Sequence, residues 1–122
     1  MGYRSKVIFG IKEEHQDKFN KLIKKACDIE GTDYLKHHIN VVEPKYTDEK
    51  YIVFEDDWLK WYCEYEEVKL INETIDDWYS EDEDCGAFLI CLGEDGCKHQ
   101  EIGEWYEVVM EEHSLRLDLK NK

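Results

Sequence analysis

Residues 86–93, with the sequence GAFLICLG, form the longest apolar run in the chain. They lie between the acidic segment 81–84 and the turn-forming sequence Glu94-Asp95-Gly96. A short apolar run between such signals is typical of a strand buried in the middle of a sheet. Because alternate side chains of a strand point to opposite faces, both faces are expected to be apolar. One set is Phe88, Ile90 and Leu92, and the other is Ala87, Leu89 and Cys91.

Two amphipathic helices are expected to cover a sheet built around this strand. The first begins after Glu13 and ends near Glu30, with Gly31 as its C-terminal cap. Its apolar face is formed by Phe19, Leu22, Ile23, Ala26 and Cys27. The second helix runs from about residue 64 to Ser80. Its apolar face is formed by Val68, Ile71, Ile75, Trp78 and Tyr79.

Further strands are predicted by alternation of apolar and polar residues. Residues 3–11 form a first strand with its more apolar face toward the core. Residues 51–55 form another, which a turn at Asp56-Asp57 connects to a return strand at 58–62.

The remaining segments carry weaker patterns. Residues 32–49 fit either a short strand or an ordered loop, and residues 97–104 are polar and indicate a loop, either without regular structure or with one helical turn. Residues 105–110 predict a last strand, which residues 114–119 continue past a bulge at 111–113.

This order of elements predicts a single α+β domain spanning residues 1–122. We expect a two-layer sandwich in which both helices cover one face of a largely antiparallel sheet. The specific arrangement expected is a ferredoxin-like or split βαβ one.

The formal charge of −14 is extreme for 122 residues, and it is unevenly distributed. Residues 1–46 hold nine Lys/Arg and seven Asp/Glu, whereas residues 47–122 hold seven Lys/Arg and 23 Asp/Glu. Such a chain is expected to repel the phosphates of a nucleic acid, so direct nucleic-acid binding is not predicted. The charge suits a basic partner protein, or it serves solubility alone.

The chain shows no secretory signal and no apolar run long enough to span a bilayer, so no membrane partner is expected. Gly2 opens a partial myristoylation motif, but Lys6 stands where Ser or Thr is required. We therefore expect a cytoplasmic protein. The odd number of cysteines, five, then favours reduced thiols over a disulfide framework.

Three short motifs, in this order, extend over most of the chain. They are Met1-Gly2-Tyr3-Arg4-Ser5-x-Val7, Lys60-Trp61-Tyr62 followed by Val68, and Gly93-Glu94-Asp95. Together they resemble a family of short, uncharacterised proteins encoded by bacteriophages. The resemblance implies a phage or prophage origin and residence in the host bacterial cytoplasm, and it assigns no catalytic residue. The segment 96–100 departs from the more acidic stretch expected in that family.

An acidic surface is the first candidate site. A converging array of carboxylates can imitate a nucleic-acid backbone and occupy the basic groove of a host nucleic-acid-handling or defence protein. The tryptophans of segment 58–61 are candidate anchors if they are exposed. Alternatively, the acidic face is simply solvated, and the aromatic residues belong to the core. The candidate partner-binding residues are Glu55, Asp56, Asp57, Trp58, Trp61, Asp76, Asp77, Glu81, Asp82, Glu83 and Asp84.

Metal and enzyme signatures are weak. The series Cys85, Cys91, Cys97 and His99 lacks the close C-x2-C pair of zinc sites, and Cys85 and Cys97 are expected at opposite ends of one strand. An EF-hand reading of 81–92 fails because Leu92 stands where an acid must bind calcium. We therefore expect no cofactor, no bound metal and no enzymatic activity. A small metal-binding protein or enzyme, and a structural or assembly protein, remain the alternative classes.

Overall fold

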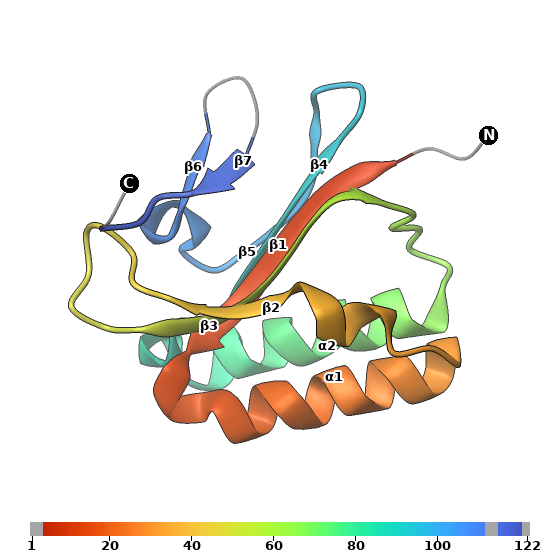
Figure 1. Ribbon diagram of the computed structural model, residues 1–122, viewed down its shortest axis with the longest axis horizontal. Coiled ribbons are helices and arrows are strands. Elements are labelled where there is room, and N and C mark those ends of the chain that lie inside the picture. The colour runs from red at the N-terminus through yellow and green to blue at the C-terminus, as the bar shows by residue number, and fades with distance from the viewer. Residues whose placement is uncertain (1–3, 112–114, 121–122) are drawn as a thin grey trace.

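A five-stranded antiparallel sheet organises the chain in the computed structural model, which describes residues 4–111 and 115–120 (Figure 1). The strands pair in the order β2-β3-β1-β4-β5. Their bounds are β1 Ser5–Lys12, β2 Ile39–Val42, β3 Tyr51–Leu59, β4 Phe88–Gly93 and β5 Lys98–Ile102. The helices are α1 Gln16–Glu30 and α2 Glu66–Glu81. Short 3-10 turns are η1 Glu13–His15, η2 Tyr34–His38, η3 Glu83–Cys85 and η4 Trp105–Glu107.

The first six long elements follow the order β1-α1-β2-β3-α2-β4. Their four strands lie as β2-β3-β1-β4, and every neighbouring pair is antiparallel. This is the βαββαβ, or ferredoxin-like, arrangement. The predicted α+β fold class is therefore confirmed, with β5 added antiparallel to the outer side of β4.

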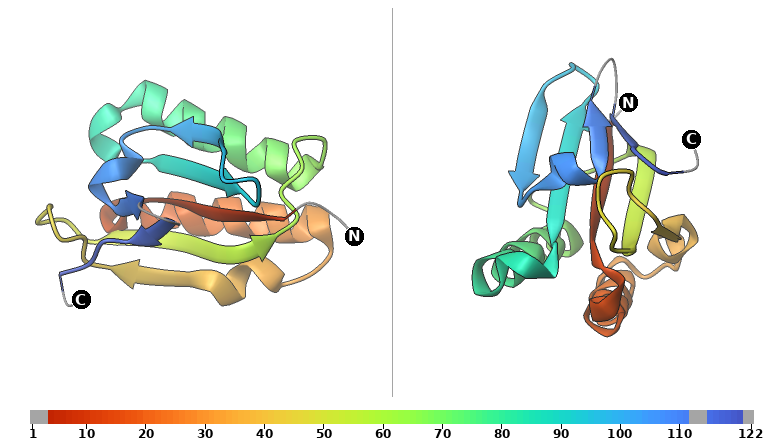
Figure 2. Two further views of the ribbon diagram at one scale, coloured as in Figure 1. Left: turned by 90° about the horizontal axis from the view of Figure 1, so that it is seen from above. Right: turned by 90° about the vertical axis from the view of Figure 1, so that its left-hand side faces the viewer.

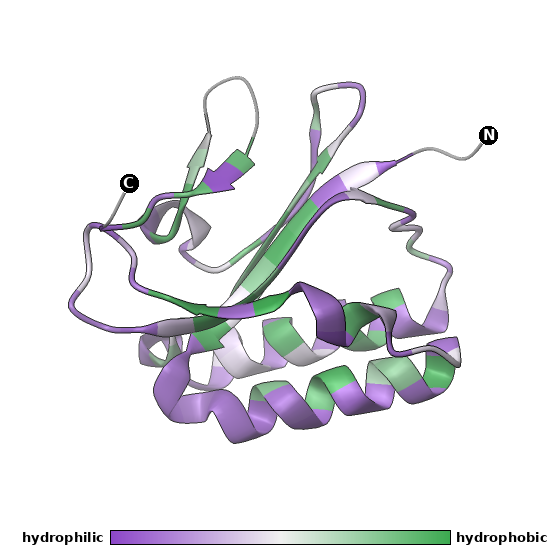
Figure 3. Ribbon diagram, viewed as in Figure 1, coloured by the Kyte–Doolittle hydropathy of each residue, from purple (hydrophilic) through white to green (hydrophobic). Residues whose placement is uncertain are grey.

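Both helices cover the same face of the sheet, as Figures 1 and 2 show. Their apolar sides pack on alternate residues of β1 and β4, including Phe9 and Leu89, which are fully buried. Burial of each such side chain stabilises the fold by about 1.5–3 kcal/mol. Figure 3 shows the resulting division, with apolar colour concentrated on the strands and polar colour on much of the helix surfaces. Gly31 ends α1 in a left-handed conformation (φ 80°), as the sequence predicted.

The opposite face of the sheet is partly covered by the C-terminal hairpin of β6 (Val109–Glu111) and β7 (Leu115–Leu117). Its buried residues pack with Ile8, Phe88 and Ile90. The hairpin is tied back to the chain after β2 by hydrogen bonds from Lys45 N to Asp118 O (2.8 Å) and from Lys120 N to Glu43 O (3.0 Å). A sheet that is apolar on both faces requires cover on both, and the hairpin supplies the second layer.

The strand predicted at 86–93 is β4, and its two alternating apolar sets face the two cores as expected. It lies inside the sheet, but β1 is the middle strand. The predicted return strand at 58–62 is wrong, because β3 continues through Asp56-Asp57 to Leu59. Three steps along β3 from Asp56 match two steps along β1, so the supposed turn is a β-bulge.

Three further expectations need correction. The hairpin partner of β3 is β2, which resolves the ambiguous segment 32–49 as η2, β2 and a loop. The predicted loop 97–104 contains the edge strand β5. The predicted strand 105–110 begins instead as η4, and β7 pairs antiparallel with β6 rather than continuing it. Residues 112 and 113 of the expected bulge, Ser114 of the strand expected after it, and Tyr3 of the first strand lie outside the described residues.

Candidate functional site

Helix α2 and the turn after it concentrate negative charge on one edge of the molecule. The apolar side of the helix is buried and is formed by Val68, Ile71 and Ile75. Between Glu66 and Asp84 the chain carries nine acidic residues and a single lysine, Lys69. Because the apolar side packs on the sheet, the carboxylates are left on the outer surface.

Segment β5–η4 adds carboxylates to the same edge. β5 is the outermost strand beside β4, α2 packs against both strands, and η4 follows at the same end of the molecule as η3 (Figure 2). We define the acidic edge as the exposed carboxylates of two segments, residues 73–84 and residues 101–107. Its members are Glu73, Asp76, Asp77, Glu81, Asp82, Glu83, Asp84, Glu101, Glu104 and Glu107.

The carboxylates of the acidic edge outnumber the cations beside them, of which Lys12 is one. Within residues 4–111 and 115–120, none of its carboxylates takes part in an ion pair. The ion pairs lie elsewhere, for example from Lys6 Nζ to Asp57 Oδ1 at 2.9 Å. The acidic edge therefore presents a negative field to solvent or to a partner.

The end of α2 is electrostatically unfavourable in isolation. The last turn of the helix has no basic residue, Glu81 is its final residue and Asp82 is its C-cap. A helix C-terminus carries a partial negative charge that favours cations and disfavours acids. A cation placed here would relieve a repulsion that is already present in the fold.

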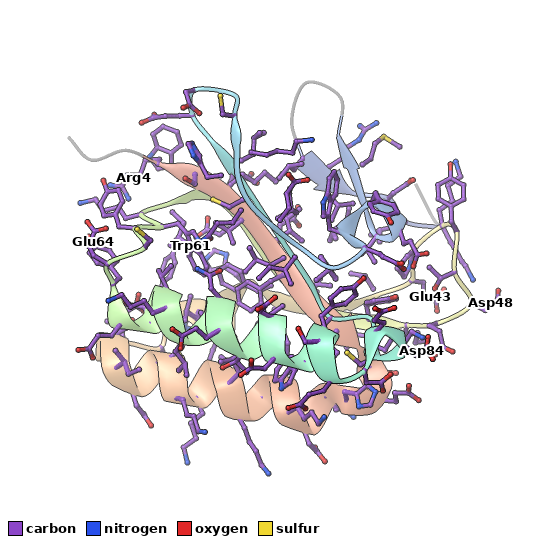
Figure 4. The ribbon with its side chains drawn as sticks, turned by 180° about the vertical axis from the view of Figure 1, so that it is seen from behind. Arg4, Glu43, Asp48, Trp61, Glu64 and Asp84 are labelled. Atoms are coloured by element: carbon purple, nitrogen blue, oxygen red, sulfur yellow. The ribbon has the colours of Figure 1, made fainter. Side chains whose placement is uncertain are left out.

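A polar pocket of about 210 Å³ opens at this end of the acidic edge. Figure 4 marks the place by Asp84, beneath the loop that carries Glu43 and Asp48. Seven ionisable residues line it, namely Lys12, Tyr51, Tyr79, Glu83, Asp84, Glu104 and Glu107. Burial, then the charges of Glu107, Glu49 and Glu104, raise the pKa of Tyr51 to about 12. Burial and the nearby carboxylates of Glu83 and Glu104 also raise the pKa of Tyr79.

The structure brings only part of the predicted site together. Asp76, Asp77 and the segment 81–84 lie on the acidic edge. Glu55 and Asp57 lie on β3, where both approach Lys6 Nζ, at 3.5 and 2.9 Å. The expected convergence of the two acidic groups is wrong, because β3 lies two strands away from β5, across β1 and β4.

Asp56 and Trp61 have structural roles in the described chain. Asp56 is only 8% exposed and accepts hydrogen bonds from the Tyr34 hydroxyl and from the backbone N–H of Trp58. Trp61 is also 8% exposed and donates from Nε1 to Gln100 Oε1 at 2.8 Å. The bulge in β3 turns Asp56 toward η2, which a sequence pattern alone does not reveal.

Trp58 is 60% exposed, as an anchor would have to be, but it lies away from the acidic edge. It lines a cleft of about 410 Å³ together with Tyr34, Tyr65 and the cations Arg4 and Lys60. Figure 4 shows Arg4, Trp61 and Glu64 at the opposite end of the molecule from Asp84. The exposed tryptophan is therefore a separate feature.

The sequence analysis missed Glu101, Glu104 and Glu107. The polar sequence of β5 was interpreted as a loop, and Trp105 and Tyr106 as part of a strand. The sequence indicates β5 only indirectly. An apolar strand such as β4 needs a paired strand on each side, and the segment that follows β4 in the chain can form one of them.

The cysteine and histidine series does not converge. Cys85 lies before β4, whereas the Cys97 carbonyl accepts a hydrogen bond from Gly93 N (2.9 Å) at the other end of that strand, as expected. Burial raises the pKa of the Cys85 and Cys91 thiols. His99 is exposed and lies 3.3 Å from Asp95 Oδ1. In the described parts of the chain, no group of three or more His, Cys, Asp or Glu residues is arranged to hold a metal ion.

Fold and surface together define a small α+β protein with a carboxylate-rich edge. None of its described helices is both long and apolar enough to cross a membrane. Comparison with known protein families, characterised proteins and solved structures gave no match for this chain.

Proposed function

We propose that this protein binds a basic partner protein through the acidic edge and blocks the partner's nucleic-acid groove. The observation that carries the proposal is the array of carboxylates on the acidic edge, which outnumber the cations beside them. Complementary charge of this kind steers association and selects basic partners over acidic ones.

The spacing of charge along α2 supports imitation of a nucleic-acid backbone. The part of the helix on the acidic edge, from Glu73 to Glu81, carries four acidic residues. At 1.5 Å per residue these span about 12 Å. One DNA strand carries three to four phosphates over about that length, at about 3.4 Å each. A basic groove would therefore meet a similar linear density of negative charge.

The context of the proposal comes from the resemblance to bacteriophage proteins. A phage protein that binds a host nuclease, polymerase or defence protein gains by occupying the groove that this enzyme uses for its substrate. We accordingly propose a host nucleic-acid-handling protein as the partner, and no nucleic acid as a direct ligand. The first motif of the resemblance includes Met1-Gly2-Tyr3, which lies outside the described residues.

The test is affinity capture from a nuclease-treated bacterial lysate, followed by washes at low and then high salt. One basic, nucleic-acid-handling protein should be retained at low salt and released at high salt. The purified partner should then be displaced by duplex DNA or RNA, and its enzymatic activity should fall in proportion to complex formation. Capture without displacement or inhibition would contradict the proposed mode of action.

A matched pair of variants separates the acidic edge from total charge. Glu81→Gln with Glu83→Gln removes two charges from the acidic edge, whereas Asp28→Asn with Glu64→Gln removes two exposed charges away from it. The first pair should weaken binding by roughly three- to tenfold, and the second should have little effect. Equal effects of both pairs would show that the charge acts through solubility or long-range repulsion, as in the solvated-face alternative.

A further inference from the structure

The hydroxyl of Tyr51 lies in the polar pocket of the acidic edge without a hydrogen-bond partner among the described residues. The residue is 3% exposed and lines the pocket, and its hydroxyl makes no hydrogen bond to any described residue. The side chain is buried as a whole, but the hydroxyl itself opens to the pocket, so a ligand that enters the pocket can bind it. Gly86 keeps the hydroxyl accessible, because a Cβ at this position would stand 2.9 Å from the oxygen.

The surrounding charges indicate that such a ligand is a cation. Glu83, Asp84, Glu104 and Glu107 line the pocket with one cation, Lys12. Lys12 forms no ion pair with a described residue, and the four carboxylates outnumber this single cation, so the pocket keeps a net negative charge. The four carboxylates also do not form a metal-binding group within the described chain. Acceptors that surround a pocket without converging on one point suit an organic cation with several N–H donors.

We infer that the pocket receives the guanidinium group of an arginine side chain from the partner protein. This inference rests on the proposed function, because it names the anchor through which the acidic edge would engage a basic protein. Arginine fits better than lysine because its planar group offers five N–H donors in fixed directions, whereas an ammonium is a compact point charge. The guanidinium can also stack on the ring of a tyrosine.

The dimensions of the pocket favour one side chain over a larger ligand. Its volume is about 210 Å³. Sites for drug-sized ligands span about 300–1,000 Å³. The position of the pocket beside the C-terminus of α2 further favours a cation.

The test is titration of the ¹⁵N-labelled protein with three probes, followed by NMR. The probes are acetyl-Gly-Arg-Gly-amide, the same peptide with citrulline in place of arginine, and butylguanidinium. The arginine peptide should cause saturable shifts at the amides of Tyr51, Gly86 and Ala87. Butylguanidinium should shift the same amides with an affinity no higher than that of the peptide, and the uncharged citrulline peptide should not bind.

Two variants assign the binding to the pocket. Glu104→Gln with Glu107→Gln should weaken the arginine peptide at least tenfold, and Tyr51→Phe should weaken it about threefold. Asp28→Asn with Glu64→Gln, equal in charge to the first, should leave affinity unchanged. Unchanged thermal unfolding of each variant shows that the fold is retained.

Several results would overturn the inference: no saturable shifts, equal binding of the citrulline peptide, equal loss in the control pair, or binding of butylguanidinium without the peptide. Failure of the pocket is distinguishable from failure of the proposed function. If Glu104→Gln with Glu107→Gln leaves partner capture intact while Asp76→Asn with Asp77→Asn, on α2 outside the pocket, weakens it, the pocket is refuted and the function stands. If the arginine peptide binds to the pocket but no partner protein is captured, the pocket stands as an arginine site and the proposed function is refuted.

Discussion

Tyr51 couples the acidic pocket to the stability of the fold at high pH. Its pKa is about 12 in the folded protein, chiefly because of burial, and near 10 in an unfolded chain. Between these values the unfolded chain has lost the phenolic proton and the folded chain retains it. The stabilisation is therefore complete below pH 10 and is lost as the pH rises toward 12, by about 2–3 kcal/mol.

We predict that Tyr51→Phe abolishes this part of the alkaline destabilisation. Near pH 8 the variant should match the original protein within about 1 kcal/mol, because the lost hydroxyl has no hydrogen-bond partner among residues 4–111 and 115–120. Urea unfolding from pH 8 to 12 measures the difference between the two, in which other titrating groups cancel. A difference that stays constant with pH would refute the prediction.

Tyr34→Phe is the informative contrast. The pKa of Tyr34 is also about 12, but its first cause is the hydrogen bond to Asp56, so the hydroxyl already has a partner at neutral pH. Its removal leaves a buried carboxylate with one donor fewer and should already destabilise the protein by about 1–3 kcal/mol at pH 7.

Asn72 on α2 has a buried polar atom, Oδ1, that forms no hydrogen bond within the described chain. We predict that Asn72→Leu, which keeps the branching at Cγ and has a better helix propensity, raises the free energy of unfolding by about 1 kcal/mol. Asn20→Leu at an exposed position of α1 controls for propensity and should gain less than about 0.6 kcal/mol. Equal gains in urea unfolding would show that burial of Oδ1 costs nothing.

At the scale of the element, the two ends of α2 should respond oppositely to the same substitution. Glu81 is at the C-terminus and Glu66 at the N-terminus. The helix dipole favours cations at the C-terminus and anions at the N-terminus. Glu81→Lys should therefore stabilise the fold by about 0.5–1 kcal/mol, and Glu66→Lys should destabilise it by a similar amount. Thermal unfolding at low salt measures both effects.

The Glu81→Lys variant also tests whether Glu81 contributes to partner binding. If the acidic edge binds a basic partner, this variant should be more stable and yet bind the partner less well. A gain in stability with undiminished partner binding would remove Glu81 from the proposed surface.

Elements with a strong period were predictable, and elements determined by tertiary pairing were not. Both helices, the cap at Gly31 and the faces of β4 follow from apolar spacing, which local chemistry enforces. β5 was missed because an edge strand exposes most of its side chains, so its sequence, KHQEI, lacks alternation of apolar residues. Asp56-Asp57 carries the composition of a turn, but pairing with β1 keeps it within a bulged strand.

At the scale of the whole molecule, the charge asymmetry was predictable and its arrangement was not. Counting residues shows that the acidity lies after residue 46. Only the sheet order separates Glu55 and Asp57 from α2 and brings Glu104 and Glu107 beside Glu83. Which carboxylates meet is set by long-range strand pairing, whose register and order a local pattern does not specify.

The net charge of −14 should make salt act oppositely on folding and on partner binding. Like charges are closer together in the folded state than in the unfolded chain, so self-repulsion opposes folding and its screening favours it. Raising NaCl from 20 to 300 mM should increase Tm by about 3–5 °C, equivalent to roughly 1 kcal/mol.

The same salt should weaken the complex, because the attraction between the acidic edge and its partner is screened as well. Neutralising Glu81, Glu83, Glu104 and Glu107 together with Gln should reduce both responses. A Tm that is independent of salt, or that falls, would mean that the carboxylates of the acidic edge do not repel one another measurably, and the electrostatic basis of the proposed interface would fail with it.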